Sequence, residues 1–347
     1  MSSMRVPCCV PCLHGPTRTG RIAASMRAVL ALLLIVLGLP LSGAPTRPAG
    51  PERLVIGGRE YARLADWAGQ RGLSLRRTVR NECQVTGSNI RMALTLDSQR
   101  ISLNGVHIWL SAPVAVARGE PWVTVLDLVR SIEPVLNPRR ARGRVRTICL
   151  DAGHGGHDTG NREGRRQEKD YTLALARELS AQLTKAGYRV LLTRNRDTYL
   201  DLGERSGLAN HAKADVFLSL HFNAGGNGGD ARGPEVYCLT PVGASSTNAR
   251  GEGAHAGAFA GNVNNSQNMA LAYHLQRALV QRPGVEDRGV KRARFAVLRT
   301  AEMPAALIEG AFMSNPTEMS RINDATWRRQ LAEAIVRGVR SYCGAIQ

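Results

Sequence analysis

The sequence predicts an α/β fold: a mostly parallel sheet covered by helices on both faces, with a smaller α+β domain before it. Between residues 147 and 342, short apolar runs alternate with segments whose apolar residues recur at helical spacing, a pattern typical of parallel strands joined by helices. Residues 214–220 form a continuous apolar run, as expected for a central strand buried on both faces. Asn104 and Gly105 form a strong hairpin signal, which indicates antiparallel strands in the smaller domain.

Residues 1–44 predict an export signal. Residues 26–27 supply a basic start, an apolar run of about a dozen residues follows, and Ser42 and Ala44 complete the small-residue pattern of a cleavage site. The run is too short to span a bilayer comfortably, and no second one follows. We therefore expect an exported, periplasmic or cell-envelope-associated protein whose mature chain has no stable membrane insertion; an uncleaved anchor is the alternative. The cysteine-containing residues 1–25 are interpreted as an over-long gene start rather than a zinc site.

The chain carries a formal net charge of +18 but has only 5% aromatic residues. Its basic residues are not interleaved with aromatic residues along helices, so we expect no nucleic-acid binding. Two explanations of the charge stay open: a solvated basic surface, or long-range attraction to a polyanionic partner such as an anionic cell wall.

Four cysteines follow the export signal: Cys83, Cys149, Cys238 and Cys343. Cys149 and Cys238 lie within apolar runs, which is typical of small buried side chains. The sequence therefore predicts no disulfide framework.

Residues 45–137 predict the smaller domain, and residues 138–145 a basic linker. The expected elements are a short helix at 61–72, strands at 90–96, 101–103 and 106–110, and a further strand and helix at 122–132. Residues 92–136 resemble the copper amine oxidase N-terminal-like modules of exported bacterial proteins, although they show no copper ligand set. The resemblance implies a role in positioning or in contact with the cell wall.

Residues 146–347 predict the main domain. Its expected elements, in order, are a strand at 147–150, a helix at 169–186 ended by Gly187, a strand at 188–193, a helix through Leu202 and Ala209, strands at 214–220 and 234–239, a helix at 269–280, strands at 296–298 and 305–309, and a helix at 327–342.

Imidazole and carboxyl groups follow the apolar strands of this domain. His154 lies in a glycine-rich turn after the first strand, His221 follows the central strand, Glu309 ends the last strand, and Glu168 precedes the first long helix. The carboxyl ends of parallel strands meet at one edge of a sheet, so we expect these side chains to converge. Burying them unpaired would cost a few kcal/mol, which a bound cation would offset. Two histidines, a carboxylate and an open position are the ligand set of catalytic zinc, and a second glutamate nearby suits proton transfer.

Other polar residues near these positions allow two interpretations. Asn223 either hydrogen-bonds substrate or caps its loop. His157 and Asp158 lie close enough to His154 to compete as ligands, but we expect surface roles for them. Arg205 is expected in a salt bridge. Three further histidines are expected to be ordinary surface or helix residues: His211, His255 and His274.

Four ordered segments of the main domain carry a family resemblance: LDAGHGGHDTG, QEKDYTLALARELSAQL, SLHFNA and GVKRARFAVLRTAEMPAALIEGAFMSNPTEM. Together they resemble the zinc-dependent N-acetylmuramoyl-L-alanine amidases of the amidase C family. The resemblance implies Zn²⁺ as cofactor, His154, Glu168 and His221 as its ligands, and Glu309 as the catalytic residue. Ala152 stands where proline is common, and residues 310–312 depart from the usual order, but neither change involves an implied ligand.

The resemblance implies an enzyme that cuts the amide bond between N-acetylmuramic acid and L-alanine in peptidoglycan. A zinc carboxypeptidase acting on stem peptides and a non-catalytic wall-binding protein are the alternatives, and an intact Glu309 favours an enzyme. Some members of the family carry a helix that plugs the zinc cleft until a partner withdraws it. Residues 244–265 are too polar and glycine-rich for a firm plug, so we expect a mobile rim and activity without an activator protein, which the sequence does not identify.

Overall fold

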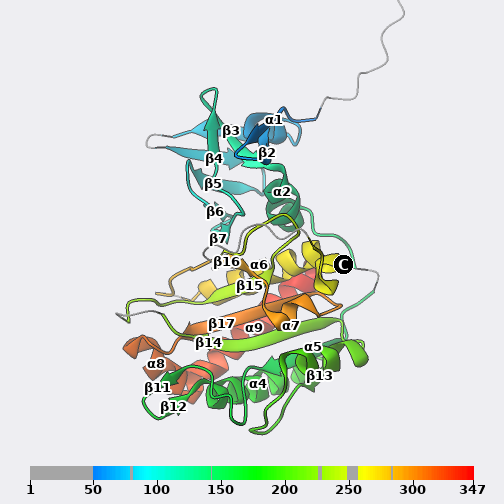
Figure 1. Ribbon diagram of the computed structural model, residues 1–347, viewed down its shortest axis with the longest axis vertical. Coiled ribbons are helices and arrows are strands. Elements are labelled where there is room, and N and C mark those ends of the chain that lie inside the picture. Colours follow the sequence, from blue (N-terminus) through cyan, green and yellow to red (C-terminus); the bar gives the residue numbers. More distant parts are fainter. Residues whose placement is uncertain (1–49, 79–80, 142, 226–228, 248–256, 283) are drawn as a thin grey trace, which may run out of the picture. The chain divides into compact units, whose positions relative to one another are not determined.

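The computed structural model describes residues 50–347 apart from 79–80, 142, 226–228, 248–256 and 283, and these described residues belong to one compact unit (Figure 1). The predicted export signal, His255 and part of the predicted rim at 244–265 lie outside the described residues. None of the helices that the structure describes is long and apolar enough to cross a membrane.

A mixed sheet of eleven strands carries the main domain. Four neighbouring strands pair in parallel: β13 (Arg189–Leu192), β10 (Thr147–Ala152), β14 (Val216–Asn223) and β17 (Ala305–Phe312). Next to them, β15 (Glu235–Leu239) runs antiparallel to β17 and parallel to β16 (Val290–Ala293). Figure 1 shows β14, β17 and β15 side by side. The parallel pairing expected for the main domain holds in this part, but antiparallel strands continue the sheet beyond it.

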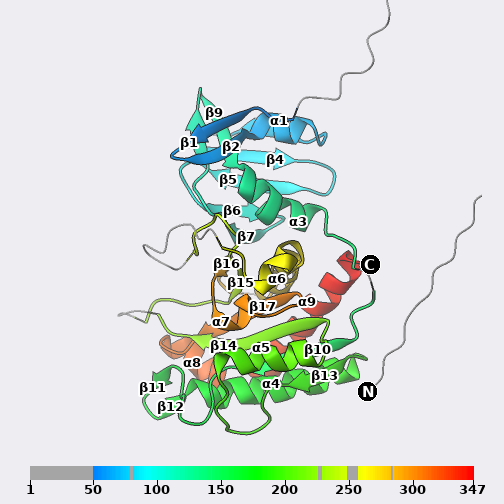
Figure 2. The same ribbon diagram turned by 45° about the vertical axis from the view of Figure 1, so that its right-hand side comes forward.

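These further strands come from the smaller N-terminal part. They form an antiparallel meander: β7 (Val106–Trp109), β6 (Arg100–Leu103), β5 (Arg91–Thr95), β4 (Glu82–Thr86) and β3 (Ser74–Arg77). Ile108 of β7 pairs with Val290 of β16, which joins the meander to the main-domain strands (Figure 2). Asn104 and Gly105 both have positive φ, 49° and 81°, so the predicted hairpin turn between β6 and β7 is confirmed.

A second, four-stranded sheet completes the N-terminal part, in the order β1 (Arg53–Ile56), β2 (Arg59–Arg63), β9 (Glu120–Thr124), β8 (Ala115–Ala117). Its helical segments are α1 (Leu64–Gly69), α2 (Val125–Asp127), a π-helical turn (Leu128–Ile132) and α3 (Glu133–Leu136). The division into domains at 137 and 146 stays a prediction.

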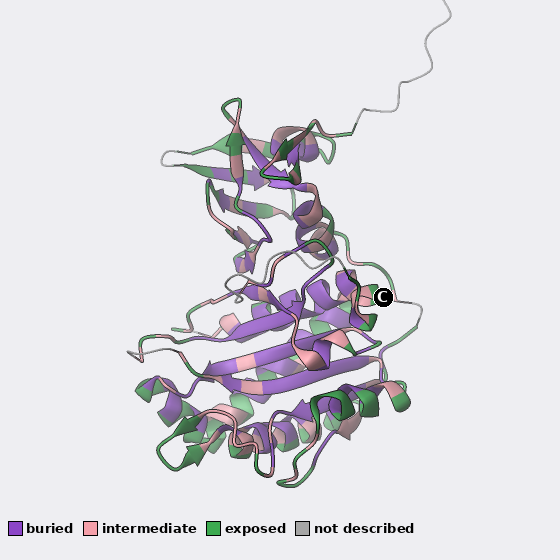
Figure 3. Cartoon of the chain, viewed as in Figure 1, coloured by how far each residue is buried: buried purple, intermediate pink, exposed green. Residues whose placement is uncertain are grey.

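Helices cover both faces of the main-domain sheet. On one face lie α4 (Glu168–Lys185), α6 (Asn265–Val280) and α9 (Ala325–Ala345), whose apolar sides pack with strand residues such as Leu220 in one core. On the other face lie α5 (Leu202–His211) and α7 (Ala296–Arg299), which pack with residues such as Phe217. The remaining elements are the hairpin β11 (Arg162–Glu163) and β12 (Arg166–Gln167), a 3₁₀ turn (Ala260–Asn264) and α8 (Pro316–Asn323). Figure 3 shows the central strands buried and the outer helix surfaces exposed.

The alternation of side chains along the strands decides which face holds the polar groups. Leu220 of β14 and Ile308 of β17 belong to the core under α4, α6 and α9. Phe217 and Leu307 belong to the core under α5 and α7. Because successive side chains on a strand point to opposite faces, residues 221 and 309 share the face of Phe217 and Leu307.

One predicted element is wrong in type, and another is wrong in its bounds. Residues 296–298 were expected to form a strand, but they lie in α7; the strand of this region is β16, which follows a turn at Gly289 with φ of 86°. A run of three apolar residues is too short to show a period. The helix expected at 61–72 is shorter, because residues 59–63 pair with β1 and β9 as β2 before α1 begins.

The four described cysteines are free and buried, so the predicted burial of Cys149 and Cys238 is confirmed.

Candidate metal centre

The loop after β10 carries His154 in an unusual backbone conformation. Its φ is +63°, a left-handed value that costs a non-glycine residue roughly 1–2 kcal/mol. Two buried arginines hold this loop by its carbonyl oxygens: Arg205 donates to the oxygen of His154 at 3.0 Å, and Arg194 donates to the oxygen of Gly153 at 2.9 Å. Arg205 also donates to Asp151 at 3.0 Å, so the predicted salt bridge is confirmed. The strained loop is therefore fixed by buried charges beneath it.

Glu168 is brought to the same place by the start of a helix. It is the first residue of α4, where a carboxylate is favoured by the positive end of the helix dipole. The hairpin β11–β12 returns the chain to this point, and the backbone nitrogen of Asn161 donates to Glu168 Oε2 at 2.9 Å. Only 1% of Glu168 is exposed.

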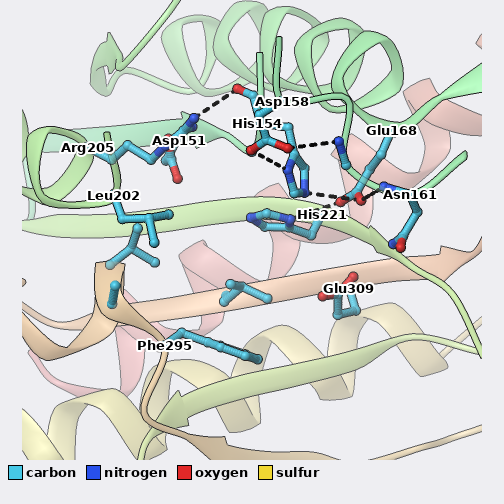
Figure 4. Close-up of a pocket in the computed structure, with 15 residues that line it drawn as sticks. Asp151, His154, Asp158, Asn161, Glu168, Leu202, Arg205, His221, Phe295 and Glu309 are labelled. Carbon is cyan, nitrogen blue, oxygen red and sulfur yellow. Dashed lines mark hydrogen bonds and ion pairs between the residues drawn. The ribbon is translucent and has the colours of Figure 1, made fainter. Parts of the chain in front are cut away.

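His154, Glu168 and His221 converge around one point. His221 Nδ1 lies 2.9 Å from Glu168 Oε1, and His154 Nε2 lies 3.1 Å from Glu168 Oε2. Each of the three side chains offers one nitrogen or oxygen atom that lies within 4.8 Å of those of the other two. Among the described residues, these three form the group that could hold a metal ion. Figure 4 shows the three side chains pointing toward one another, with Glu309 and Phe295 across the pocket.

The electrostatics of the cluster follow from these contacts. Burial alone would raise the pKa of Glu168, but the hydrogen bonds with His154 and His221 outweigh it and hold the pKa well below its usual range. Burial would lower the pKa of His154, but its hydrogen bonds with Glu168 and Asp158 raise it. The carboxylate is therefore kept in its charged, ligating form.

Glycines leave the room that this cluster fills. A Cβ on Gly160, whose φ is +62°, would lie 2.6 Å from both Glu168 Oε2 and His154 Cδ2. A Cβ on Gly153 would overlap the ring of His221. The glycine-rich sequence is thus needed for close approach of the chain to the three side chains.

Asp158 orients His154 from its other side. The turn Gly155–Asp158 closes with two backbone hydrogen bonds, and Asp158 Oδ2 then lies 2.9 Å from His154 Nδ1. A carboxylate on the second ring nitrogen fixes the orientation of a ligating histidine and leaves Nε2 for the metal. Asp158 stays outside the ligand group and keeps 40% of its side chain exposed, as expected of a surface residue, but it also contacts a ligand from behind. His157 is exposed and stacks on Tyr199, with ring centroids 4.0 Å apart.

Glu309 lies beside this cluster without a hydrogen-bond partner for one of its oxygens. It is opposite His221 in the parallel register of β14 and β17, and its Oε2 is buried with no partner among the described residues. Burial, together with the negative charges of Glu168 and Glu235, raises the pKa of Glu309 well above its usual value. The prediction that Glu309 ends its strand is wrong, because β17 continues to Phe312.

A second buried carboxylate, Glu235, lies on the next strand. It is opposite Glu309 in the antiparallel register of β15 and β17, and 2% of it is exposed. Its oxygens accept hydrogen bonds from Arg288 Nε at 2.8 Å, from Lys291 Nζ, from Tyr237 Oη at 2.8 Å and from Asn223 Nδ2 at 2.7 Å. Burial would raise the pKa of Glu235, but Lys291 and Arg288 lower it.

These groups line or adjoin a cavity of ≈ 340 Å³. Its lining combines the polar side chains of His154, Glu168, His221 and Glu309 with apolar residues of the α5 and α7 segments: Leu202, Phe295, Ala296 and Val297. An apolar lining with a few converging polar groups is typical of a binding site.

The sequence-predicted site residues therefore separate into two groups. His154, Glu168, His221 and Glu309 come together around the cavity. Asn223 does not line it; its side-chain amide donates to Glu235. His211 is exposed on α5, and His274 is buried on α6, away from the cavity lining. Nothing in the sequence pointed to the contact between Asp158 and His154 or to Glu235.

Comparison with known proteins points to one family. Residues 148–341 match the profile of the N-acetylmuramoyl-L-alanine amidase family. The chain is 36% identical over 248 residues to N-acetylmuramoyl-L-alanine amidase AmiC of Neisseria meningitidis, a match that covers 65% of this chain and 58% of that protein. It is 33% identical over 227 residues to the probable cell wall amidase LytH of Staphylococcus aureus, covering 65% of this chain and 66% of that protein. The chain thus spans less than two thirds of the length of these relatives.

Among solved structures, the N-acetylmuramoyl-L-alanine amidase of Clostridium difficile 630 is 35% identical, with a TM-score of 0.48, over 58% of this chain and 97% of that one.

Proposed function

The chain belongs to the N-acetylmuramoyl-L-alanine amidase family, and we propose that it hydrolyses the amide bond between N-acetylmuramic acid and the L-alanine of the stem peptide in peptidoglycan. The observation that carries this proposal is the position of Glu309: a buried carboxyl oxygen without a partner, next to a His₂Glu cluster at a cavity. The predicted export signal supports action in the periplasm or cell envelope. The N-terminal domain is proposed to position the enzyme or to contact the wall.

The cluster fits zinc by the chemistry of its donors. Two imidazoles and one carboxylate are the protein ligands of catalytic zinc, so His154, Glu168 and His221 would hold the ion. The glycines at 153 and 160 support this assignment, because a side chain at either position would collide with the donors. When bound, zinc would polarise the scissile carbonyl and make a water molecule acidic enough to attack at neutral pH.

The chain's own residues would move the proton and exclude water. Glu309 Oε2 would accept a proton from the attacking water and deliver it to the departing nitrogen of L-alanine, a role that suits a carboxyl group whose pKa burial has raised. Asp158 would keep the ring of His154 oriented through its Nδ1. The apolar lining residues Leu202 and Phe295 would exclude bulk water from the reacting bond.

One digestion experiment tests the proposal. Purified cell-wall sacculi are incubated with the mature protein, with and without a chelator, and with Glu309→Gln and His211→Ala variants. We expect glycan strands with free muramoyl carboxyl groups and peptides with a new L-alanine amino terminus from the wild type and from His211→Ala, and neither product after chelation or with Glu309→Gln. Release of free amino acids from the stem peptide would instead show a carboxypeptidase, and wall binding without any product would show a non-catalytic protein.

A further inference from the structure

Two basic side chains lie on the far side of Glu309 from the metal cluster. Arg288 and Lys291 both contact Glu235, which is the strand neighbour of Glu309. We infer that Arg288 binds a carboxylate of the stem peptide and so sets the preference of the enzyme between an acidic stem peptide and its amide. This inference rests on the proposed amidase function.

The register of three strands places this arginine near the reacting bond. His221, Glu309 and Glu235 lie opposite one another on β14, β17 and β15, so their side chains form one row on the same face of the sheet. Directly opposite residues on neighbouring strands are roughly 4.5–5.5 Å apart at Cα. Arg288 Nε lies 2.8 Å from Glu235 Oε2 at the end of this row. A peptide leaving the metal across Glu309 would therefore reach Arg288 after roughly 10 Å, the length of about three extended residues.

Arg288 is held in place before any ligand arrives. Its guanidinium carbon lies 4.7 Å from the ring centre of Phe312, the last residue of β17. The backbone of the same segment is fixed from β7, because Trp109 Nε1 donates to the oxygen of Arg288 at 3.0 Å and the backbone nitrogen of His107 donates to Asp287 at 2.7 Å. An arginine ordered in this way loses little conformational entropy when it binds.

Arg288 has donors that Glu235 does not use. Lys291 contacts Glu235 and also acts on the buried carboxyl group of Glu309, whereas Arg288 contacts Glu235 through Nε. Neither terminal nitrogen of Arg288 donates a hydrogen bond to any residue that the structure describes, whereas 27% of the side chain is exposed. A planar guanidinium with two free donors binds a carboxylate through paired hydrogen bonds.

The substrate supplies a carboxylate on one side only. The muramic acid carboxyl is consumed in the scissile amide, so the sugar side is neutral, while the residues after L-alanine carry free carboxylates unless they are amidated. Lys291 is less available than Arg288, since 12% of its side chain is exposed and it lies 5.8 Å from the ring centre of Trp109. Arg288 is therefore the group that would distinguish an acidic stem peptide from its amide.

The test compares two substrates that differ in one group. Muramoyl peptides of equal length are prepared with either the second or the third residue carrying a free α-carboxylate or its amide, and kcat/KM is measured for each. A hydrogen-bonded charge pair corresponds to a preference of about 10–100-fold for the free acid in the wild type. Arg288→Gln should bring the ratio close to one, mainly by raising KM for the acid. Arg288→Lys, which keeps the charge but loses the paired donors, should give an intermediate ratio.

Arg232→Gln is the matched control, because Arg232 is an exposed arginine in the neighbouring loop that pairs with Glu286 instead. Its acid-to-amide ratio should equal that of the wild type. Equal cleavage of both substrates by the wild type, or an equal loss on both in Arg288→Gln, would overturn the carboxylate site while leaving the amidase proposal intact. Failure of the wild type to cleave either substrate would overturn both.

Discussion

Glu309 on β17 lies directly opposite His221 on β14 in the parallel register of the two strands. The sheet ladder therefore fixes the distance between the proposed proton carrier and one proposed metal ligand. Glu309 Oε2 has no hydrogen bond to a described residue, so side-chain contacts do not hold it there. Substitution of this residue should change the chemistry without moving the cluster.

We expect Glu309→Gln to lower kcat for muramoyl-peptide hydrolysis by about 10²–10⁴-fold, because the amide cannot accept and return a proton. The bound zinc content, measured by atomic spectroscopy on the purified protein, should stay at that of the wild type. The melting temperature should not fall, since the substitution removes a carboxyl group that is buried at Oε2 without a partner. A variant that loses its zinc together with its activity would contradict the assignment of Glu309 as a residue outside the ligand set.

The glycine at 160 offers a second test of the cluster. Gly160→Ala and Gly164→Ala both place a side chain on a backbone with φ near +60°, so they share a strain of about 1–2 kcal/mol. Only the Cβ at 160 would collide with Glu168 and His154; nothing lies within 4 Å of the Cβ at 164. We expect zinc affinity, measured by competition with a chelating dye, to fall about 10–100-fold in Gly160→Ala and to be unchanged in Gly164→Ala. Equal effects would mean that strain, not the collision, is responsible.

Asp158 gives a third prediction. Asp158→Asn keeps the shape of the side chain that contacts His154 Nδ1 at 2.9 Å but removes its charge. The ligating nitrogen of His154 becomes less basic, and we expect zinc affinity to fall about 10–100-fold. His157→Ala, in the same loop, removes a ring that stacks on Tyr199 and should leave zinc affinity unchanged. The same affinity in wild type and Asp158→Asn would show that the aspartate does not orient the ligand.

Much of the site could be predicted from the sequence because its polar residues lie where buried strands usually carry apolar ones. His154, His221 and Glu309 are polar groups in or directly after apolar strands, which is costly unless the group has a function. Asp158 could not be predicted in the same way. It lies in a glycine-rich loop that gives no local signal of order, and its contact with His154 depends on the closed turn from Gly155.

Glu235 illustrates a second limit. In the sequence it is one charged residue at the start of an apolar run, and this pattern gives no sign of a functional role. Its importance comes from the antiparallel register that sets it opposite Glu309, and from Arg288 and Lys291 on a later segment. Register between strands that are distant in sequence is set by packing of the whole sheet, so it cannot be read from either strand alone. The strand predicted at 296–298 is wrong for a related reason. Tertiary packing, and not the spacing of apolar residues in so short a segment, makes α7 a helix.

The buried histidine on α6 should make stability depend on pH. Burial of His274, with a smaller effect of Arg277, lowers its pKa from 6.5 to about 4. Its Nδ1 lies 2.9 Å from the hydroxyl of Ser341 on α9. Between these two pKa values the unfolded chain binds a proton at this position and the folded chain does not, so the free energy of unfolding falls as the pH falls. From pH 7 to pH 5 this single group should cost about 2 kcal/mol.

His274→Gln removes the titrating group, and urea unfolding at pH 7 and pH 5 measures the consequence. The wild type should lose about 2 kcal/mol more of its unfolding free energy than His274→Gln over this interval, because all other titrating groups are common to both proteins. His211→Gln, which alters an exposed histidine on α5, should show the pH dependence of the wild type. Burial between α6 and α9 should keep the imidazole of His274 from accepting a proton in the folded chain. Equal losses of unfolding free energy in the wild type and His274→Gln would contradict this, because they would mean that the imidazole accepts a proton as readily in the folded chain as in the unfolded one.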